Sequence, residues 1–191
     1  MNARPKPTLT VAEYLAIERR AETKSEFYGG EVFPLAAASL EHQAVKENLV
    51  GKLRPHFKDG HIFFTGRRLQ LGPDGAHAYP DIVIVSAPPG PAVGPHESLA
   101  DPQIIIEVLD HAAERNEYGW KYHCYMHSPT VREYVLVSTD EMRIVRFARE
   151  SADTWRTTDF IDPDGEFALA TCPVRITLRD IYAGVPVPAI E

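Results

Sequence analysis

Two spacings of apolar residues occur along the chain, one typical of helices and one typical of strands. Thr10-Val-Ala-Glu13 has the form of a capping box, and apolar residues follow it at helical spacing. A helix is therefore predicted over about 11–19. After Ser39, which can act as an N-cap, apolar residues recur every four positions along one face. This repeat predicts a second helix over about 40–57, whose opposite face carries lysines.

The rest of the pattern predicts mostly strands. Gly29-Gly30 separates two apolar-rich runs, which predicts a two-residue hairpin because both glycines tolerate positive φ. Further strands are predicted over about 61–71, 79–86, 103–109, 131–138 and 141–148. A helix predicted over about 113–126 lies between two of them and gives a right-handed βαβ unit. Segment 87–102 predicts a surface loop, and segment 151–191 predicts short edge strands and a closing helix.

These elements indicate the fold class and the number of domains. A chain of 191 residues of which 44% are apolar is long enough to bury one core, so a single domain over residues 1–191 is expected. The order of the elements predicts an α/β fold that contains a βαβ unit followed by an antiparallel strand. An N-terminal helix and a β-hairpin precede that unit.

Composition and charge argue against several classes of protein. No apolar run approaches the roughly 18 residues of a membrane span, and none follows the basic N-terminus, so a cytoplasmic protein without membrane contact is expected. The net charge of −7 argues against a protein that coats nucleic acid non-specifically, because that mode needs a broad cationic surface. The cysteines, Cys124 and Cys172, are expected to be free thiols.

Two acidic residues stand in or beside strands that are predicted to be buried. Asp81 follows Pro80 at the start of one apolar run, and Glu107 lies inside another. An unpaired charge there costs on the order of several kcal/mol, so such an acid is paired, protonated or bound to a cation. Carboxylates on adjacent strands can bind Mg²⁺ or Mn²⁺ through oxygen. Alternatively, Glu107 pairs with an Arg or Lys, and Asp81 simply caps its strand.

Two further clusters allow a binding site but have simpler explanations. His123 and His127 stand four apart on a predicted helix, a spacing that can bind zinc, yet no second Cys or His pair follows at finger-like spacing. Arg67 and Arg68, together with Lys52, Arg54 and Lys58 of the preceding helix, can line a phosphate-binding groove. Solvated surface charge explains these basic residues equally well.

Seven fragments occur in an order that resembles one known family. They are TVAEYLAIE, KSEFYGGEVF, ASLEHQAVKENL, YPDIVIV, IIIEVL, a helix bearing Lys121, and VREYVLVS, over roughly residues 8–150. Pro80-Asp81 before one strand, with Glu107 in the next, resembles the PD-(D/E)XK nuclease superfamily, and the wider pattern resembles its Uma2 family. The resemblance implies a restriction endonuclease-like core with a central mixed β-sheet flanked by helices. It also implies a divalent metal (Mg²⁺ or Mn²⁺) and hydrolysis of DNA phosphodiester bonds. Double-stranded DNA is the expected substrate, and a homodimer is the expected assembly.

The resemblance also implies roles for particular residues. Asp81 and Glu107 match the acids of the PD and (D/E)XK elements and would be catalytic metal ligands. The lysine of that element usually stands two residues after the acid, where this chain has Leu109. Lys121 would supply it from the following helix and would stabilise charge on the phosphate or help to deprotonate water. The alternative for Lys121 is an exposed ion pair with Glu117.

Other positions leave alternatives open. His42 occupies the family's place for a catalytic histidine and would orient the phosphate or a water molecule, or else cap its helix. Glu31 would be a further acid near the site, or a hairpin residue that faces water. Residues 110–113, Asp-His-Ala-Ala, replace the Ser-Pro-Ser-Thr turn of relatives. A catalytically silent nucleic-acid-binding or interaction module, or a hydrolase of another phosphate ester, is therefore the alternative to an endonuclease.

Overall fold

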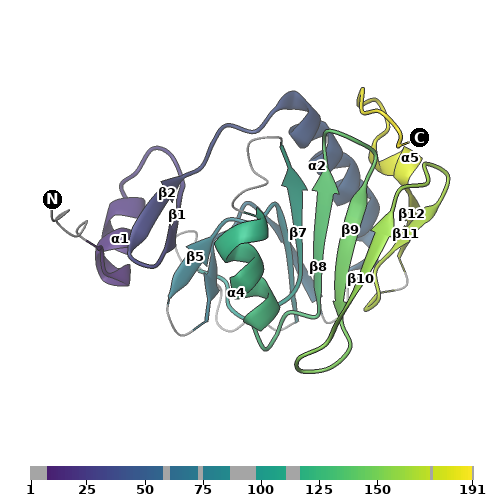
Figure 1. Cartoon of the computed structure of the whole chain (residues 1–191). Coiled ribbons are helices and arrows are strands. Elements are labelled where there is room, and N and C mark those ends of the chain that lie inside the picture. Colours follow the sequence, from purple (N-terminus) through teal and green to yellow (C-terminus); the bar gives the residue numbers. More distant parts are fainter. Residues whose placement is uncertain are drawn as a thin grey trace, which may run out of the picture.

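A mixed β-sheet forms the centre of the part of the chain that the structure describes (Figure 1). The computed structural model describes residues 8–57, 61–72, 75–86, 98–110, 117–172 and 174–190. In spatial order the sheet contains β10 (Trp155–Phe160), β9 (Ile144–Arg149), β8 (Glu133–Ser138), β7 (Pro102–Leu109), β6 (Ile82–Ser86) and β3 (His61–Thr65). Only β7 and β8 are parallel among these neighbouring pairs, which confirms the predicted mixed sheet.

Helices cover both faces of this sheet (Figure 1). One face carries α2 (Leu40–Leu53), the C-terminal α5 (Leu178–Ile181), and the short pair β11 (Glu166–Ala168) and β12 (Arg175–Thr177). The other face carries α4 (Tyr122–His127). Even-numbered isoleucines of β6 and β7 pack under α2, while Ile105 packs under α4, because successive strand residues point to opposite faces. Glu107 therefore points toward the α4 face.

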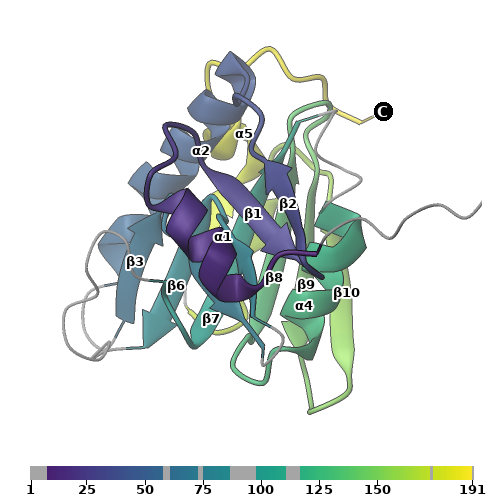
Figure 2. The ribbon, with the colours of Figure 1, turned by 90° about the vertical axis from the view of Figure 1, so that its left-hand side faces the viewer.

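A smaller antiparallel sheet and α1 (Val11–Glu18) lie at one side of the molecule (Figure 2). The sheet contains β2 (Glu31–Pro34), β1 (Ser25–Tyr28), β5 (Ala76–Ala78) and β4 (Leu69–Leu71), in that order. The predicted capping box is present: Glu13 donates its N–H to the Thr10 hydroxyl (3.3 Å) and accepts the Thr10 N–H (2.8 Å). Gly29 and Gly30, with φ of 59° and 82°, make the hairpin turn. The predicted N-terminal helix and hairpin are thus confirmed.

The connection from β7 to β8 runs through α4 in front of the sheet. In Figure 1 both strands point up and β8 lies to the right of β7, so the crossover is right-handed, as predicted. The predicted continuous helix over 113–126 is wrong in its described part. Gly119 leaves the helical conformation (φ −96°, ψ −121°), so α4 is a short helix after a wide turn at Glu117–Lys121. Residues 113–116 lie outside the described ranges.

Two other predicted elements end earlier than expected. The strand over 61–71 is two strands, β3 and β4, which belong to different sheets and are separated at Gly66, where φ is 59°. The helix over 40–57 ends at Leu53 and continues as one 3₁₀ turn (Arg54–His56). Pro55 causes this change because it has no N–H to continue the α-helical bonds. The sequence pattern did not predict β5 at all.

The end of the loop predicted over 87–102 is hydrogen-bonded to the small sheet and leads directly into β7. Residues 87–97 lie outside the described ranges. Leu99 donates its N–H to the carbonyl of Arg68 (2.8 Å) and accepts the N–H of Gln70 (2.9 Å), and β7 already begins at Pro102. This segment therefore ties the small sheet to the strand that carries Glu107.

Candidate active site

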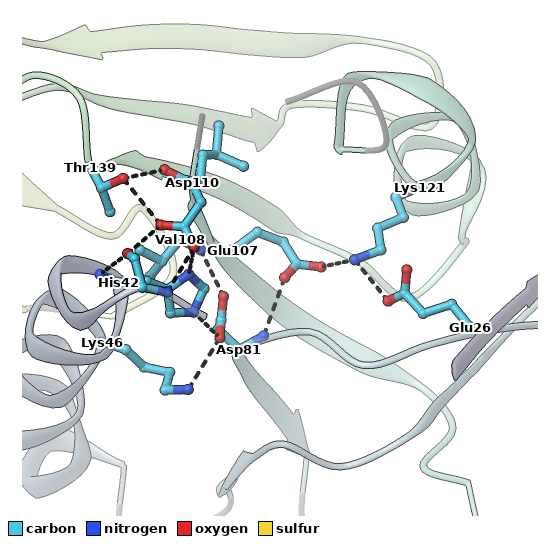
Figure 3. Close-up of polar contacts among 11 residues, drawn as sticks. Glu26, His42, Lys46, Asp81, Glu107, Val108, Asp110, Lys121 and Thr139 are labelled. Atoms are coloured by element: carbon cyan, nitrogen blue, oxygen red, sulfur yellow. Dashed lines mark hydrogen bonds and ion pairs between the residues drawn. The ribbon is translucent and has the colours of Figure 1, made fainter. Parts of the chain in front are cut away.

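Asp81 and Glu107 lie next to each other at one end of the central sheet (Figure 3). Asp81 directly precedes β6, and Glu107 stands near the end of β7. The antiparallel register places Ile82 opposite Ile106. The N–H of Asp81 donates to Glu107 Oε2 (3.2 Å), and the N–H of Val108 donates to Asp81 Oδ2 (2.9 Å). Backbone donors of both strands thus fix the two carboxylates side by side.

Two side chains of α2 reach Asp81. Its Oδ1 lies 2.8 Å from Nε2 of His42 and 3.5 Å from Nζ of Lys46. His42 and Lys46 are four residues apart and therefore share one face of the helix. Burial by itself raises the pKa of Asp81, but the hydrogen bond and charge of His42, with smaller contributions from a backbone N–H and Lys46, hold it below its ordinary value. Asp81 is therefore an ionised carboxylate at neutral pH.

Asp110 lies on the other side of the His42 ring. Its Oδ2 is 3.7 Å from Nδ1 of His42. Ser39 donates its N–H (3.1 Å) and its hydroxyl (2.7 Å) to the two oxygens of Asp110, and the Thr139 hydroxyl lies 3.3 Å from one of them. The Ser39 hydroxyl also accepts the N–H of His42 (3.0 Å) as the N-cap of α2. Ser39 does the capping, and His42 points into the site between two aspartates.

Lys121 is buried between two glutamates. Its Nζ lies 2.8 Å from Oε1 of Glu26 and 3.4 Å from Oε1 of Glu107 (Figure 3). The residue is only 3% exposed. Glu107 also accepts the hydroxyl of Tyr125 (2.9 Å), and Glu26 accepts the N–H of Tyr79 (2.9 Å). The lysine partner that the alternative explanation requires for Glu107 is therefore present, and it is Lys121.

These side chains open onto one pocket of about 270 Å³. The charged and ionisable residues that line it are Glu26, His42, Lys46, Asp81, Glu107, Asp110 and Lys121. Segment 34–38, between β2 and α2, closes another side. A pocket that joins several acids to two lysines offers oxygen ligands for a cation and positive charge for a phosphate.

The structure brings all four predicted site residues to this pocket: Asp81, Glu107, Lys121 and His42. Glu31 is not brought there; its exposed side chain is on β2, and the described pocket lining does not include it. Of residues 110–113, only Asp110 lies in the described ranges. The side chain of Glu117, the alternative partner of Lys121, lies outside them.

The sequence analysis gave no role in the site to three of the pocket's charged residues: Glu26, Lys46 and Asp110. Lys46 had a usable signal, because it stands one helical turn after His42. Glu26 had none, since one acid in a short hairpin strand looks like a residue that faces water. It is 2% exposed only because β1 packs against the segment that carries Lys121.

The donor atoms fit a small, hard cation. Mg²⁺ commonly uses one or two carboxylates and keeps several water molecules, and Asp81 and Glu107 supply two carboxylates. Across the described residues, no group of three or more His, Cys, Asp or Glu side chains is placed to hold a metal. His123 and His127, whose ring centres are 4.2 Å apart, accordingly belong to no such group, so a zinc site there has no support. A cation at the pocket would depend on the two carboxylates and on water or phosphate oxygens.

The fold and this placement of residues define a protein of the restriction endonuclease-like class. The sequence matches the family described as "Uma2: Putative restriction endonuclease" over residues 11–179. The chain belongs to the Uma2 family. The match continues past residue 150, where we expected the resemblance to end. Family membership supports a nuclease.

Similar proteins agree with this assignment. Two uncharacterized proteins of Synechocystis sp., sll1609 and slr1290, are 29% and 23% identical to the chain over 160 and 183 residues. The similarity covers 83% and 95% of this chain, and 90% and 95% of theirs. A crystal structure from Anabaena variabilis, described as "a putative nuclease", has a TM-score of 0.71 at 18% identity and covers 92% of this chain and 98% of its own. That likeness confirms the fold.

Among the described residues, no helix has the length and apolar character needed to cross a membrane.

Proposed function

We propose that the protein is a metal-dependent endonuclease that hydrolyses phosphodiester bonds of DNA in this pocket. The observation that carries the proposal is the convergence of Asp81, Glu107 and Lys121, from three separate elements, on one pocket. Each of the three is largely buried, and burying charge is costly unless partners or a ligand compensate. Clustered ionisable groups with shifted pKa values in a cleft are characteristic of functional sites, and the pKa of Asp81 is lowered here.

Each residue has a chemical task in this proposal. Asp81 and Glu107 would hold Mg²⁺ or Mn²⁺; when bound, such a cation stabilises charge on a phosphate and makes water a stronger nucleophile at neutral pH. His42 orients Asp81 through its 2.8 Å contact. The ammonium of Lys121 offsets negative charge on the phosphate that is cut. Lys46, which also lines the pocket, attracts that phosphate.

The test is metal-dependent cleavage of supercoiled plasmid and of single-stranded DNA. We expect wild-type protein to cut with Mg²⁺ or Mn²⁺ and not with EDTA. Asp81→Asn and Glu107→Gln should each lower the rate at least about 100-fold, because each removes a charge that holds the cation. Asp180→Asn is the matched control, since this half-exposed aspartate pairs with Lys52 away from the pocket. Equal cleavage by all the variants would assign the activity to some other site or protein.

A silent nucleic-acid-binding module is the second candidate, and one observation favours it. Protein donors already contact both carboxylates at the pocket: His42 and Lys46 at Asp81, and Lys121 and Tyr125 at Glu107. A site neutralised in this way needs no metal to be stable. Calorimetric titration separates the candidates, because the endonuclease should bind Mn²⁺ in a manner that Asp81→Asn abolishes. If wild-type protein neither cuts DNA nor binds Mn²⁺, the silent module is favoured.

The expected substrate and assembly belong to the same proposal. An endonuclease that cuts both strands of a duplex commonly works as a two-fold dimer, which presents one site to each strand. We therefore expect double-stranded DNA to be the preferred substrate and the protein to be a homodimer. Light scattering of the full chain, with and without duplex DNA, would measure the mass directly. A monomer under both conditions would contradict the dimer.

A further inference from the structure

A second pocket lies on the other side of Tyr79 from the candidate active site. Its volume is about 280 Å³, and it is formed by the C-terminal end of α1, the segment leading into β1, and the turn between β3 and β4. Figure 2 views the molecule from the side on which α1 and β1 lie in front. Tyr79 lines this pocket and also the first.

Positive charge is concentrated at this second pocket. Four basic residues line it: Arg19, Lys24, Arg67 and Arg68. Two acidic residues, Glu18 and Glu22, also line it. Glu18 is largely buried, and its carboxylate accepts bonds from the Ser25 N–H (3.2 Å), the Ser25 hydroxyl (2.6 Å) and the Tyr79 hydroxyl (2.8 Å). An excess of cations at one place is notable in a chain with a net charge of −7, and it suits an anionic ligand.

Two of the four basic side chains, those of Arg68 and Lys24, are held in place by contacts within the protein. Arg68 is 7% exposed and donates from Nε to the Ser98 hydroxyl (2.8 Å). Lys24 donates to the carbonyl of Gly66 (2.8 Å) and lies over the ring of Tyr79, 4.9 Å from its centre. These contacts connect the turn between β3 and β4 to the start of β1. This wall of the pocket is therefore formed before any ligand arrives, which lowers the entropic cost of binding.

The two pockets are close enough to act on one nucleic-acid strand. Tyr79 is two residues before Asp81, and two residues of extended chain span at most about 7 Å. Successive phosphates of one strand rise about 3.4 Å along a duplex axis. A strand that runs along residues 79–81 with one phosphate at Asp81 would therefore bring another phosphate, about two steps away, to the level of Tyr79.

We propose that the second pocket binds a backbone phosphate of the nucleic acid, about two phosphates along the strand from the one that is cut. Arg67 and Arg19 contact this phosphate, while Lys24 and Arg68 shape the pocket around it. The inference rests on the proposed function for the identity of the strand. Arg67 and Arg68, which the sequence suggested as part of a phosphate-binding groove, do line this pocket. Their basic neighbours in it are Arg19 and Lys24. Lys52 pairs with Asp180 instead.

The experiment measures binding without cleavage. The full-length protein is titrated in EDTA with a fluorescent DNA duplex and with the corresponding single strand, over a series of KCl concentrations. The variants are Arg67→Gln and Arg19→Gln. Arg20→Gln is the matched control, because Arg20 is an exposed neighbour of Arg19 that does not line this pocket. Thermal melting checks that each variant is folded, and plasmid cleavage with Mg²⁺ is measured on the same preparations.

The expected result is weaker binding by both pocket variants and not by the control. A lost charged hydrogen bond should weaken binding about tenfold, and the slope of log K against log salt should fall by about 0.9 for duplex or 0.7 for single strand. Binding equal to that of wild type in both pocket variants would overturn the inference, and so would equal weakening in Arg20→Gln. Wild-type protein that binds no DNA at low salt would overturn it as well.

Failure of the proposed function gives a different result. If wild-type protein binds DNA but never cuts it, endonuclease activity is rejected. The comparison of Arg67→Gln and Arg19→Gln with Arg20→Gln still decides whether the second pocket holds a phosphate. If wild-type protein cuts DNA and the pocket variants bind and cut as well as it does, only the second pocket is rejected.

Discussion

Replacing Lys121 by methionine should destabilise the protein strongly. The ammonium lies 2.8 Å from Glu26 and 3.4 Å from Glu107, and all three side chains are only 3–4% exposed. Methionine fills a similar volume but leaves two carboxylates facing each other without their cation. Removal of one partner from a buried ion pair typically costs about 3–5 kcal/mol, against a total stability of about 5–15 kcal/mol for a domain.

A second substitution shows whether charge is the cause. In wild-type protein, Glu26→Gln weakens a contact of Lys121 and should cost stability. In the Lys121→Met background, Glu26→Gln removes one of the two carboxylates left without a cation, so it should restore stability. The double variant should therefore be more stable than the sum of the single effects by about 1–3 kcal/mol. The glutamine side chain introduced by Glu26→Gln keeps an oxygen that can accept the N–H of Tyr79, as the carboxylate does in wild-type protein.

Urea unfolding at pH 7 in EDTA, followed by circular dichroism, measures each free energy of unfolding. Lys52→Met is the matched control, because its 3.0 Å pair with Asp180 is about half exposed and should contribute at most about 1 kcal/mol. The reasoning is refuted if Lys121→Met costs no more than Lys52→Met. It is also refuted if the effects of Lys121→Met and Glu26→Gln simply add within about 0.5 kcal/mol.

Four further predictions concern the metal site, the core, a helix cap and a buried histidine. Mg²⁺ should raise the melting temperature of wild-type protein and not that of Asp81→Asn; an equal rise in both would contradict the metal site. Leu49→Ala, at a side chain with 0% exposure, should cost about 2–5 kcal/mol in urea unfolding. Ser39→Ala should cost about 1–2 kcal/mol in the same assay, since the hydroxyl caps α2. Burial, aided by the positive charge of Arg68, lowers the pKa of His77 to about 4. Between about pH 6.5 and 4, His77 is therefore protonated in the unfolded chain but not in the folded protein. Stability should therefore fall by up to about 3 kcal/mol as pH falls through that range, and His77→Asn should show a shallower fall.

Local structure could be predicted from the sequence because its causes are local. The capping box at Thr10 and the Gly29-Gly30 turn depend on residues within a few positions of each other, and both formed as predicted. Long β-branched runs gave β6, β7 and β8, since a segment that is apolar on both faces must lie inside a sheet. Predicted ends were less accurate, as Pro55 and Gly66 show.

The candidate site was only partly visible in the sequence. Asp81 and Glu107 stood out because a carboxylate in an apolar run requires compensation. Lys121 and His42 were suggested by family resemblance, and periodicity alone gave no reason to place them beside those acids. Asp110 appeared only as part of an altered turn, although its carboxylate links Ser39 of α2 to the end of β7.

Tertiary structure alone decided which charges meet. Glu26 becomes a partner of Lys121, 95 positions away by number, because β1 packs against the Glu117–Lys121 turn, where Tyr28 stacks on Trp120. The second pocket likewise needs α1 and the turn at Gly66 to come together. Sequence patterns report each segment's own preference for helix, strand or turn, whereas such contacts depend on how all segments share one core. The sequence by itself therefore determined most of the helices and strands and the two acids, and packing determined the rest of the site.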